Sequence, residues 1–299
     1  MPVIVLEARD FSSPFFLVRI WTIFFTCATF SLVASLDSVD LNKNPIHMQT
    51  YKVFCMSTWC LFFALTLSIQ ILTMIQFHNL LRISWKNVTI TVAALGAYFS
   101  LSSAVIYPWL IMDNQTPTAR AIAAATTSCL TFLGYAFESF MLHRQTPDQR
   151  GYMGSKPGLL KTVQVWGGCQ MIPLIVEAIH DMPSEIHGWQ LWVSVASYTI
   201  CLTASLITLV VIIGDFAARC CLPFNRFLSG FSLMGVSLYM VAAVICYTKI
   251  LQLKEPGHNH LPQNIVELFI METVVVSITL LAYTVDLAFS IKLLCYRGH

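Results

Sequence analysis

Long apolar stretches without a single charged residue recur along the whole chain, and they restrict its fold more than any other feature. Such stretches cover 20–36, 53–81, 87–112, 121–137, 186–214 and 227–248. Hydrophobic residues make up 57% of the 299 and charged residues only 11%, whereas about a quarter of a soluble domain is charged. About 20 apolar residues suffice to cross a bilayer. The sequence therefore predicts a multi-pass membrane protein.

Two further apolar stretches, 162–176 and 273–285, are shorter because the acids Glu177, Glu272 and Asp286 interrupt them. Counting both gives eight predicted spans. Because lipid cannot satisfy an open backbone, each span is expected to be a helix and the fold all-α. The spans are expected at 16–37, 53–77, 88–110, 119–142, 159–180, 190–213, 228–250 and 267–293.

The distribution of Lys and Arg predicts the orientation. If the chain has eight spans, five basic residues lie on the side of the membrane opposite the amino terminus: Lys43, Lys52, Arg120, Lys249 and Lys254. The other twelve of the 17 lie on the amino-terminal side. Because basic residues concentrate in the cytoplasm, both termini are expected there. The first fourteen residues contain Glu7, Arg9 and Asp10 and do not resemble a cleavable signal, so the first span is expected to stay.

A short motif occurs twice, near the ends of the fourth and eighth spans. "LGYAFES" at 133–139 and "LAYTVDL" at 281–287 share a Leu, a Tyr and an acid at the same spacing. Tyr135 and Tyr283, like Glu138 and Asp286, are separated by 148 positions. A weaker similarity pairs "CLFFAL" from Cys60 with "CLTASL" from Cys201. The motif predicts an internal repeat of four spans.

Four spans per repeat give both halves the same orientation, unlike the inverted repeats of many transporters, although parallel-repeat transporters exist. We therefore expect two tandem four-helix domains, 16–142 and 159–293. The Pro- and Gly-containing stretch 143–158 is the predicted cytoplasmic linker. Residues 1–15 and 294–299 are the predicted cytoplasmic termini.

The acids inside the spans have two interpretations. A buried ionisable group is by default a functional candidate, and Glu138 and Asp286 could bind a proton or a lipid headgroup. Tyr and acid three positions apart also share one helix face, so Tyr135 with Glu138, and Tyr283 with Asp286, could be polar anchors that fix helix packing. Both acids lie toward the cytoplasmic ends of their spans. Glu177 and Glu272 lie near the outer ends, where interfacial solvation accounts for them most simply.

Other side chains are candidates for lipid contact or lipidation. The linker and the start of the fifth span are basic, which favours anionic headgroups, although the positive-inside requirement alone also explains this charge. Candidate headgroup contacts are Arg144, Arg150, Lys156 and Lys161. Candidate palmitoylation sites at the cytoplasmic membrane edge are Cys220, Cys221 and Cys295. The remaining cysteines fall mostly within spans and are expected to be reduced thiols.

The sequence contains no recognisable motif for catalysis, metal binding or nucleic-acid binding. "HNH" at 258–260 lacks the ligand spacing of a metal site, and no phosphate loop, paired-cysteine motif, catalytic nucleophile motif or nucleic-acid-binding feature occurs. We expect no cofactor, no metal and no catalytic residue.

Several blocks across the chain resemble the myeloid-associated differentiation marker family. They are "FSLVAS", "ISWKNVTIT", "LSSAVIYP", "AIAAATTSC", "GYMGSKPGLLK", "FLSGFSL" and "LLAYTVDL", and the chain is identified as a marker-like relative. The resemblance implies two tandem MARVEL domains, each a four-helix membrane module. It also implies a plasma-membrane or vesicle location and a role in cholesterol-rich microdomains, membrane apposition or trafficking.

The function expected from these observations is a non-enzymatic membrane organiser. Its expected partners are membrane lipids, including cholesterol and anionic lipids, and other membrane or cortical proteins. The alternative is a channel or transporter that uses Glu138 and Asp286 as proton or cation ligands; in that case both acids should face a hydrated cavity.

Overall fold

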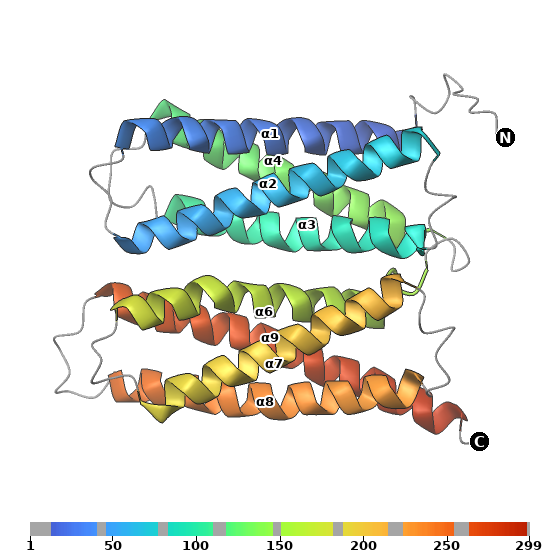
Figure 1. Cartoon of the computed structure of the whole chain (residues 1–299), viewed down its shortest axis with the longest axis vertical. Helices are drawn as coiled ribbons and strands as arrows, with labels where there is room; N and C mark the ends of the chain where they lie inside the picture. The colour runs from blue at the N-terminus through green and yellow to red at the C-terminus, as the bar shows by residue number, and fades with distance from the viewer. Residues whose placement is uncertain are drawn as a thin grey trace. The chain divides into compact units, whose positions relative to one another are not determined.

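The structure is a computed structural model that describes residues 13–40, 46–76, 83–109, 118–145, 151–181, 188–214, 224–253 and 263–297. Within these ranges the regular secondary structure is helical, as the composition predicts, and comprises eight long helices (Figure 1). They are α1 (Pro14–Asp40), α2 (Ile46–Met74), α3 (Trp85–Tyr107), α4 (Ala119–His143), α6 (Lys156–Asp181), α7 (Trp189–Ile213), α8 (Phe224–Leu253) and α9 (Gln263–Arg297).

Seven of these helices are long and apolar enough to cross a membrane: α1, α2, α3, α6, α7, α8 and α9. They fit an integral multi-pass membrane protein. The fourth predicted span forms α4, which falls outside this group. Its sequence carries Arg120 and Glu138 and is rich in Ala, Thr and Ser, so its mean hydropathy is lower.

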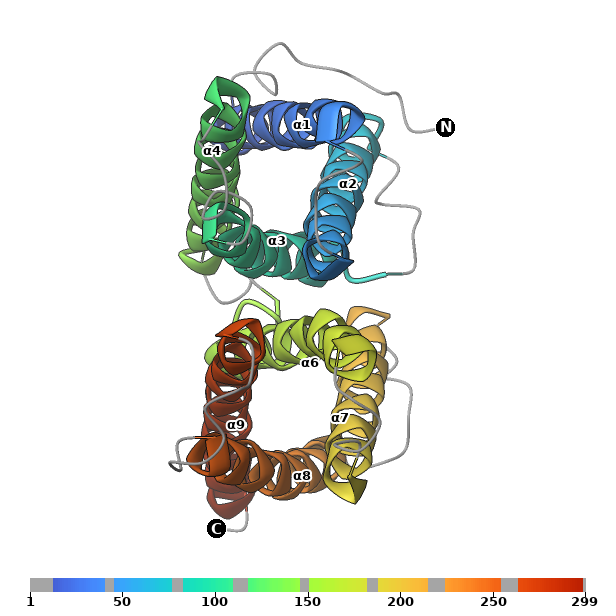
Figure 2. The same ribbon diagram turned by 90° about the vertical axis from the view of Figure 1, so that its left-hand side faces the viewer.

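The chain divides into two compact units, Met1–Ser155 and Lys156–His299. In the first unit α1 contacts α2 and α4, and α3 contacts the same two helices. In the second unit α6 contacts α7 and α9, and α8 contacts α7 and α9. Figure 2 shows the result within each unit: four helices in a ring, each with two neighbours. Each ring thus has an interior to which all four of its helices contribute.

Hydroxyl side chains are numerous in these apolar helices, and local hydrogen bonds satisfy many of them. In α1, Thr22, Thr26 and Thr29 donate to the carbonyl oxygens of the residues four positions earlier, at 2.6–2.8 Å. A hydroxyl bonded in this way is stable where water is absent. The amino ends of two helices are capped similarly, since Ser13 accepts from the Phe16 amide and Thr118 from the Ala121 amide.

The two ends of the predicted linker 143–158 belong to helices, since α4 includes His143 and α6 begins at Lys156. Between them, residues 151–155 pack onto the first unit. Met153 is fully buried, and its amide donates to Asn87 Oδ1 at 3.0 Å. The carbonyl of Gly154 lies 2.7 Å from His143 Nδ1. Gly151 has a φ of +72°, a conformation that glycine adopts without strain. These contacts assign 151–155 to the first unit, because a free linker would leave Met153 exposed.

Candidate functional site: a polar clasp in each unit

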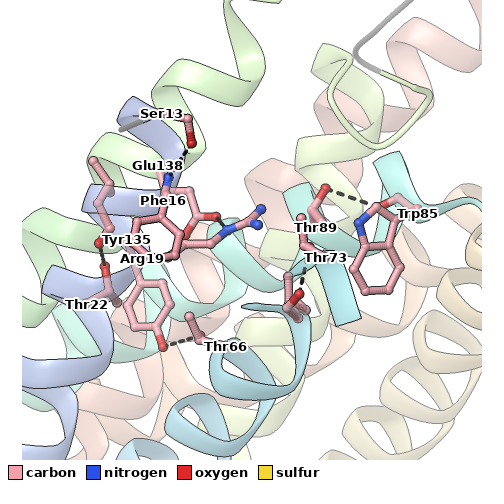
Figure 3. A network of polar contacts seen from close by, with 12 residues as sticks. Ser13, Phe16, Arg19, Thr22, Thr66, Thr73, Trp85, Thr89, Tyr135 and Glu138 are labelled. Atoms are coloured by element: carbon pink, nitrogen blue, oxygen red, sulfur yellow. Dashed lines mark hydrogen bonds and ion pairs between the residues drawn. The ribbon is translucent and has the colours of Figure 1, made fainter. Parts of the chain in front are cut away.

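An ion pair lies inside the first unit, between its first and last helices. Arg19 Nε on α1 is 2.6 Å from Glu138 Oε1 on α4, and both side chains are buried (Figure 3). Arg19 lies five residues after the start of α1 and Glu138 five before the end of α4, so the pair is near one end of the ring. A charged side chain exposed to lipid is costly, and pairing these two charges offsets part of that cost.

Tyr135 lies three residues before Glu138 on the same face of α4 and contacts the other two helices. Its hydroxyl is hydrogen-bonded to Thr66 Oγ1 of α2 at 2.8 Å (Figure 3). The same hydroxyl donates to the Phe62 carbonyl, also on α2, at 3.0 Å. Its ring packs against Gly96 on α3. Tyr135 and Glu138 therefore connect α4 to every other helix of the unit. We call these two residues with Arg19, Thr66 and Gly96 the first polar clasp.

The second unit contains an equivalent ion pair between α6 and α9. Asp286 Oδ2 accepts from Lys161 Nζ at 2.5 Å, from Ser232 Oγ of α8 at 2.5 Å and from Gln164 Nε2 at 3.1 Å. Asp286 is 0% exposed and Lys161 2%. Three donors to one buried oxygen offset the cost of removing the carboxylate from water.

Tyr283 occupies the place of Tyr135 in the second unit. Its hydroxyl lies 2.7 Å from Ser205 Oγ on α7 and donates to the Cys201 carbonyl at 3.5 Å. Its ring packs against Gly235 on α8. The second polar clasp accordingly consists of Lys161, Asp286, Tyr283, Ser205 and Gly235, with Gln164 and Ser232 as additional donors.

Each helix of the first clasp has its own sequence offset from the equivalent helix of the second clasp. Lys161 follows Arg19 by 142 positions, and Asp286 follows Glu138 by 148. Ser205 follows Thr66, and Gly235 follows Gly96, by 139. The structure also corrects the weaker repeat predicted from Cys60 and Cys201. The carbonyl that corresponds to that of Cys201 belongs to Phe62, so that alignment was wrong by two residues.

The interiors differ at the end of each unit away from the clasp. The first unit has a buried, largely apolar cluster there: Val33, Cys55, Trp59, Tyr107 and Ala124. At the same offsets the second unit has Ser194, Tyr198, Cys246 and Glu272 in place of the last four. Tyr198 donates to Glu272 Oε1 at 3.1 Å, and its oxygen lies 3.6 Å from Cys246 Sγ. The second unit is therefore polar at both ends of its interior.

Two further acids were expected to be solvated at the outer ends of their spans. Glu177 is instead 1% exposed, so that expectation was wrong for Glu177. Glu272 accepts the hydrogen bond from Tyr198, so it has a protein partner.

The candidate lipid-contact residues separate into two groups. Arg144 and Lys156 are exposed, and the guanidinium of Arg144 lies over the Phe140 ring, 4.7 Å from its centroid. Lys161 is buried and directed to Asp286, which removes it from any headgroup. Cys295 is exposed and, like the other seven cysteines of the described ranges, forms no disulfide. Arg150, Cys220 and Cys221 lie outside the described residues.

The cations of the two clasps were not predicted, because Arg19 and Lys161 look like basic residues that flank membrane spans. Their matching positions are a signal that could have identified them. Arg19 and Lys161 are each the sixth residue of the first helix of their unit, and they are 142 positions apart. Within the described part of the chain, no three His, Cys, Asp or Glu side chains lie close enough together to hold a metal ion.

Comparison with known proteins identifies relatives over most of the chain. The rat protein named myeloid-associated differentiation marker is 34% identical over 80% of this chain and 72% of its own length. The human protein of that name is 32% identical over 82% and 73%. The Xenopus laevis protein named myeloid-associated differentiation marker homolog is 29% identical over 97% of this chain and 96% of its own. No family profile and no solved structure matches.

Proposed function

The chain belongs to the myeloid-associated differentiation marker family, and from that premise we propose that it is a non-enzymatic multi-pass membrane organiser. Its sites of action are cholesterol-rich microdomains, regions of membrane apposition, or trafficking vesicles. The resemblance of its sequence blocks to tandem MARVEL proteins supports this role.

The observation that carries the proposal is the use of both repeated acids in contacts between helices. An acidic side chain that binds a transported ion must release its protein partner to do so. Glu138 and Asp286 each have a cation of their own unit within 2.6 Å. Ion pairs of this kind contribute little net stability, whereas removing one partner is costly. We infer that the clasps fix which helix faces meet and give each unit one rigid shape.

The proposed architecture has eight spans in two MARVEL-type four-helix bundles, with both termini in the cytoplasm. α4 is the span that composition alone does not support. Its pairing with Arg19 removes the main obstacle, because Glu138 would meet a cation rather than lipid. The excess of Lys and Arg on the amino-terminal side supports the orientation.

The test combines Glu138→Gln with Asp286→Asn in the full chain. We expect lower thermal stability in detergent and a changed distribution between ordered and disordered phases of plasma-membrane vesicles. Lys292→Gln, which removes an exposed charge at the end of α9, is the matched control. A double variant as stable as the parent, with an unchanged distribution, would contradict the proposal.

One observation favours a channel or transporter as a second candidate. In the described part of the second unit, Asp286 Oδ1 and Gln164 Oε1 are buried acceptors without a hydrogen-bond partner, and a proton bound at Asp286 Oδ1 would turn one of them into a donor. Proteoliposomes with a pH-sensitive dye and an imposed potential test this candidate. A proton flux that Asp286→Asn abolishes at unchanged stability would favour it over the organiser.

A further inference from the structure

An apolar groove runs along the outside of the first unit, between α1 and α4. Its volume is about 620 Å³, within the range of small-molecule sites. The walls include Leu17 and Trp21 from α1 and Phe137 and Phe140 from α4. Gly134 also lines the groove, at the point where Thr22 and Trp21 of α1 pack closely against α4. All four wall side chains are about half exposed. The clasp residues Arg19 and Glu138 do not line the groove, so its surface is suited to hydrocarbon.

The two ends of this groove differ in chemistry. At one end the Trp21 indole reaches across to α4 and donates to the Leu130 carbonyl at 3.4 Å. At the other end Arg144, the first residue after α4, places its guanidinium over the ring of Phe140, which itself lines the groove. An occupant that matches both ends has an apolar tail toward Trp21 and an anionic group beside Arg144.

The length of the groove matches one leaflet. Leu133 lines the groove near the hydrogen bond of Trp21. Arg144 follows it by eleven residues, which is about 16 Å along a helix. Half of a bilayer's hydrocarbon core is about 15 Å. A lipid whose headgroup lies beside Arg144 would therefore have its chain along the whole groove.

We propose that this groove binds one anionic phospholipid, with an acyl chain between α1 and α4 and its phosphate at Arg144. The inference rests on the membrane function and orientation proposed above, which place Arg144 at the cytoplasmic, anionic leaflet. It gives the organiser a defined lipid, held by the first unit.

The second unit supplies an internal comparison. At the offsets of the repeat, Val163, Ala282, Val285 and Ala288 stand where the groove has Trp21, Gly134, Phe137 and Phe140. The counterpart of Arg144 is Lys292, which is also exposed. The second unit thus keeps a cation but lacks the three aromatic residues, so the lipid should prefer the first.

The experiment uses native mass spectrometry of the purified full chain with dioleoyl phosphatidylserine or dioleoyl phosphatidylcholine, which share their acyl chains. We expect at least about fivefold more retained phosphatidylserine, the factor typical of one basic group at an anionic surface. Arg144→Gln should abolish the preference and Lys292→Gln should keep it. Phe137→Val with Phe140→Ala, which copies the second unit, should reduce retention of both lipids.

A phosphatidylserine with a photoreactive acyl chain locates the site independently, because its crosslinks should fall on peptides that contain 17–21 and 133–140. Equal retention of the two lipids, equal effects of Arg144→Gln and Lys292→Gln, or crosslinks elsewhere would overturn the inference. Displacement of the phosphatidylserine by cholesterol alone would also overturn the inference, as would a dimer that excludes lipid from the groove. These variants leave both clasps intact, so failure here is distinguishable from failure of the proposed function, which the clasp variants test.

Discussion

The ring of Tyr135 covers Gly96 so closely that a Cβ atom at position 96 would lie 2.7 Å from the ring. Gly235 has the same relationship to Tyr283 in the second unit. Each clasp therefore depends on a glycine in the third helix of its unit, which permits the tyrosine to reach the second helix.

Gly96→Ala should destabilise the protein by about 1–3 kcal/mol, because the buried ring must move and would strain its bonds to α2. Gly230→Ala is the matched control, since nothing lies within 4 Å of a Cβ there. Thermal unfolding in detergent measures both changes. Equal stabilities for the two variants would show that the ring can shift without cost.

The ion pair of the first clasp can be examined by a double-mutant cycle. Arg19→Met or Glu138→Leu alone should cost about 3–5 kcal/mol, because each leaves a buried charge without its partner. The double variant should recover most of that loss, since it leaves no charge in the interior. Stability in detergent gives the coupling energy, and purely additive losses would argue against a direct interaction.

Ser232→Ala removes one of the three donors to Asp286 while keeping the volume of the interior nearly unchanged. We expect a loss of about 1.5–3 kcal/mol, the usual range for a hydrogen bond to a charged group. Ser237→Ala in the same helix is the control, because that hydroxyl is exposed and bonds only to its own helix. Chemical unfolding of both variants decides whether the third donor contributes.

A buried carboxylate should destabilise the apolar end of the first unit, although the equivalent end of the second unit contains one. Ala124→Glu places a carboxylate at a fully buried position in a largely apolar cluster, and we expect the protein to misfold. Glu272→Ala, the reverse change at the equivalent position, should cost only about 1–3 kcal/mol, because it leaves the Tyr198 hydroxyl without its acceptor. Surface expression and size-exclusion profiles compare them; a well-folded Ala124→Glu would mean that this end admits water.

Cys295 is the described candidate for palmitoylation, and its thiol is exposed near the end of α9. We expect acyl exchange with a mass tag to label the parent, and Cys295→Ser to lose one tag. Cys60→Ser, at an exposed thiol in the middle of α2, should keep the full number. An unchanged tag count in Cys295→Ser would exclude this site.

The sequence predicted the repeated Tyr and acid because both are unusual residues in an apolar run and occur at one offset. It did not predict Arg19 or Lys161 as partners, because a basic residue one turn inside a span looks the same as one that marks the membrane edge. The glycines and hydroxyls of the clasps are common in membrane helices, so only contacts between helices distinguish Gly96 or Ser205 from their neighbours. Glu272 is recognisable in the sequence as a polar residue, but its hydrogen bond to Tyr198 depends on the ring, which places α7 and α9 opposite each other across the interior.

The ion pair between the first and last helices of each unit has a consequence for biosynthesis. Arg19 and Glu138 are 119 residues apart, and Lys161 and Asp286 are 125 apart. At about 5–20 residues per second, each cation enters the membrane roughly 6–25 s before the ribosome delivers its acid. During that interval three helices of the unit are present with an uncompensated charge, which is the state that a chaperone of membrane insertion would have to protect.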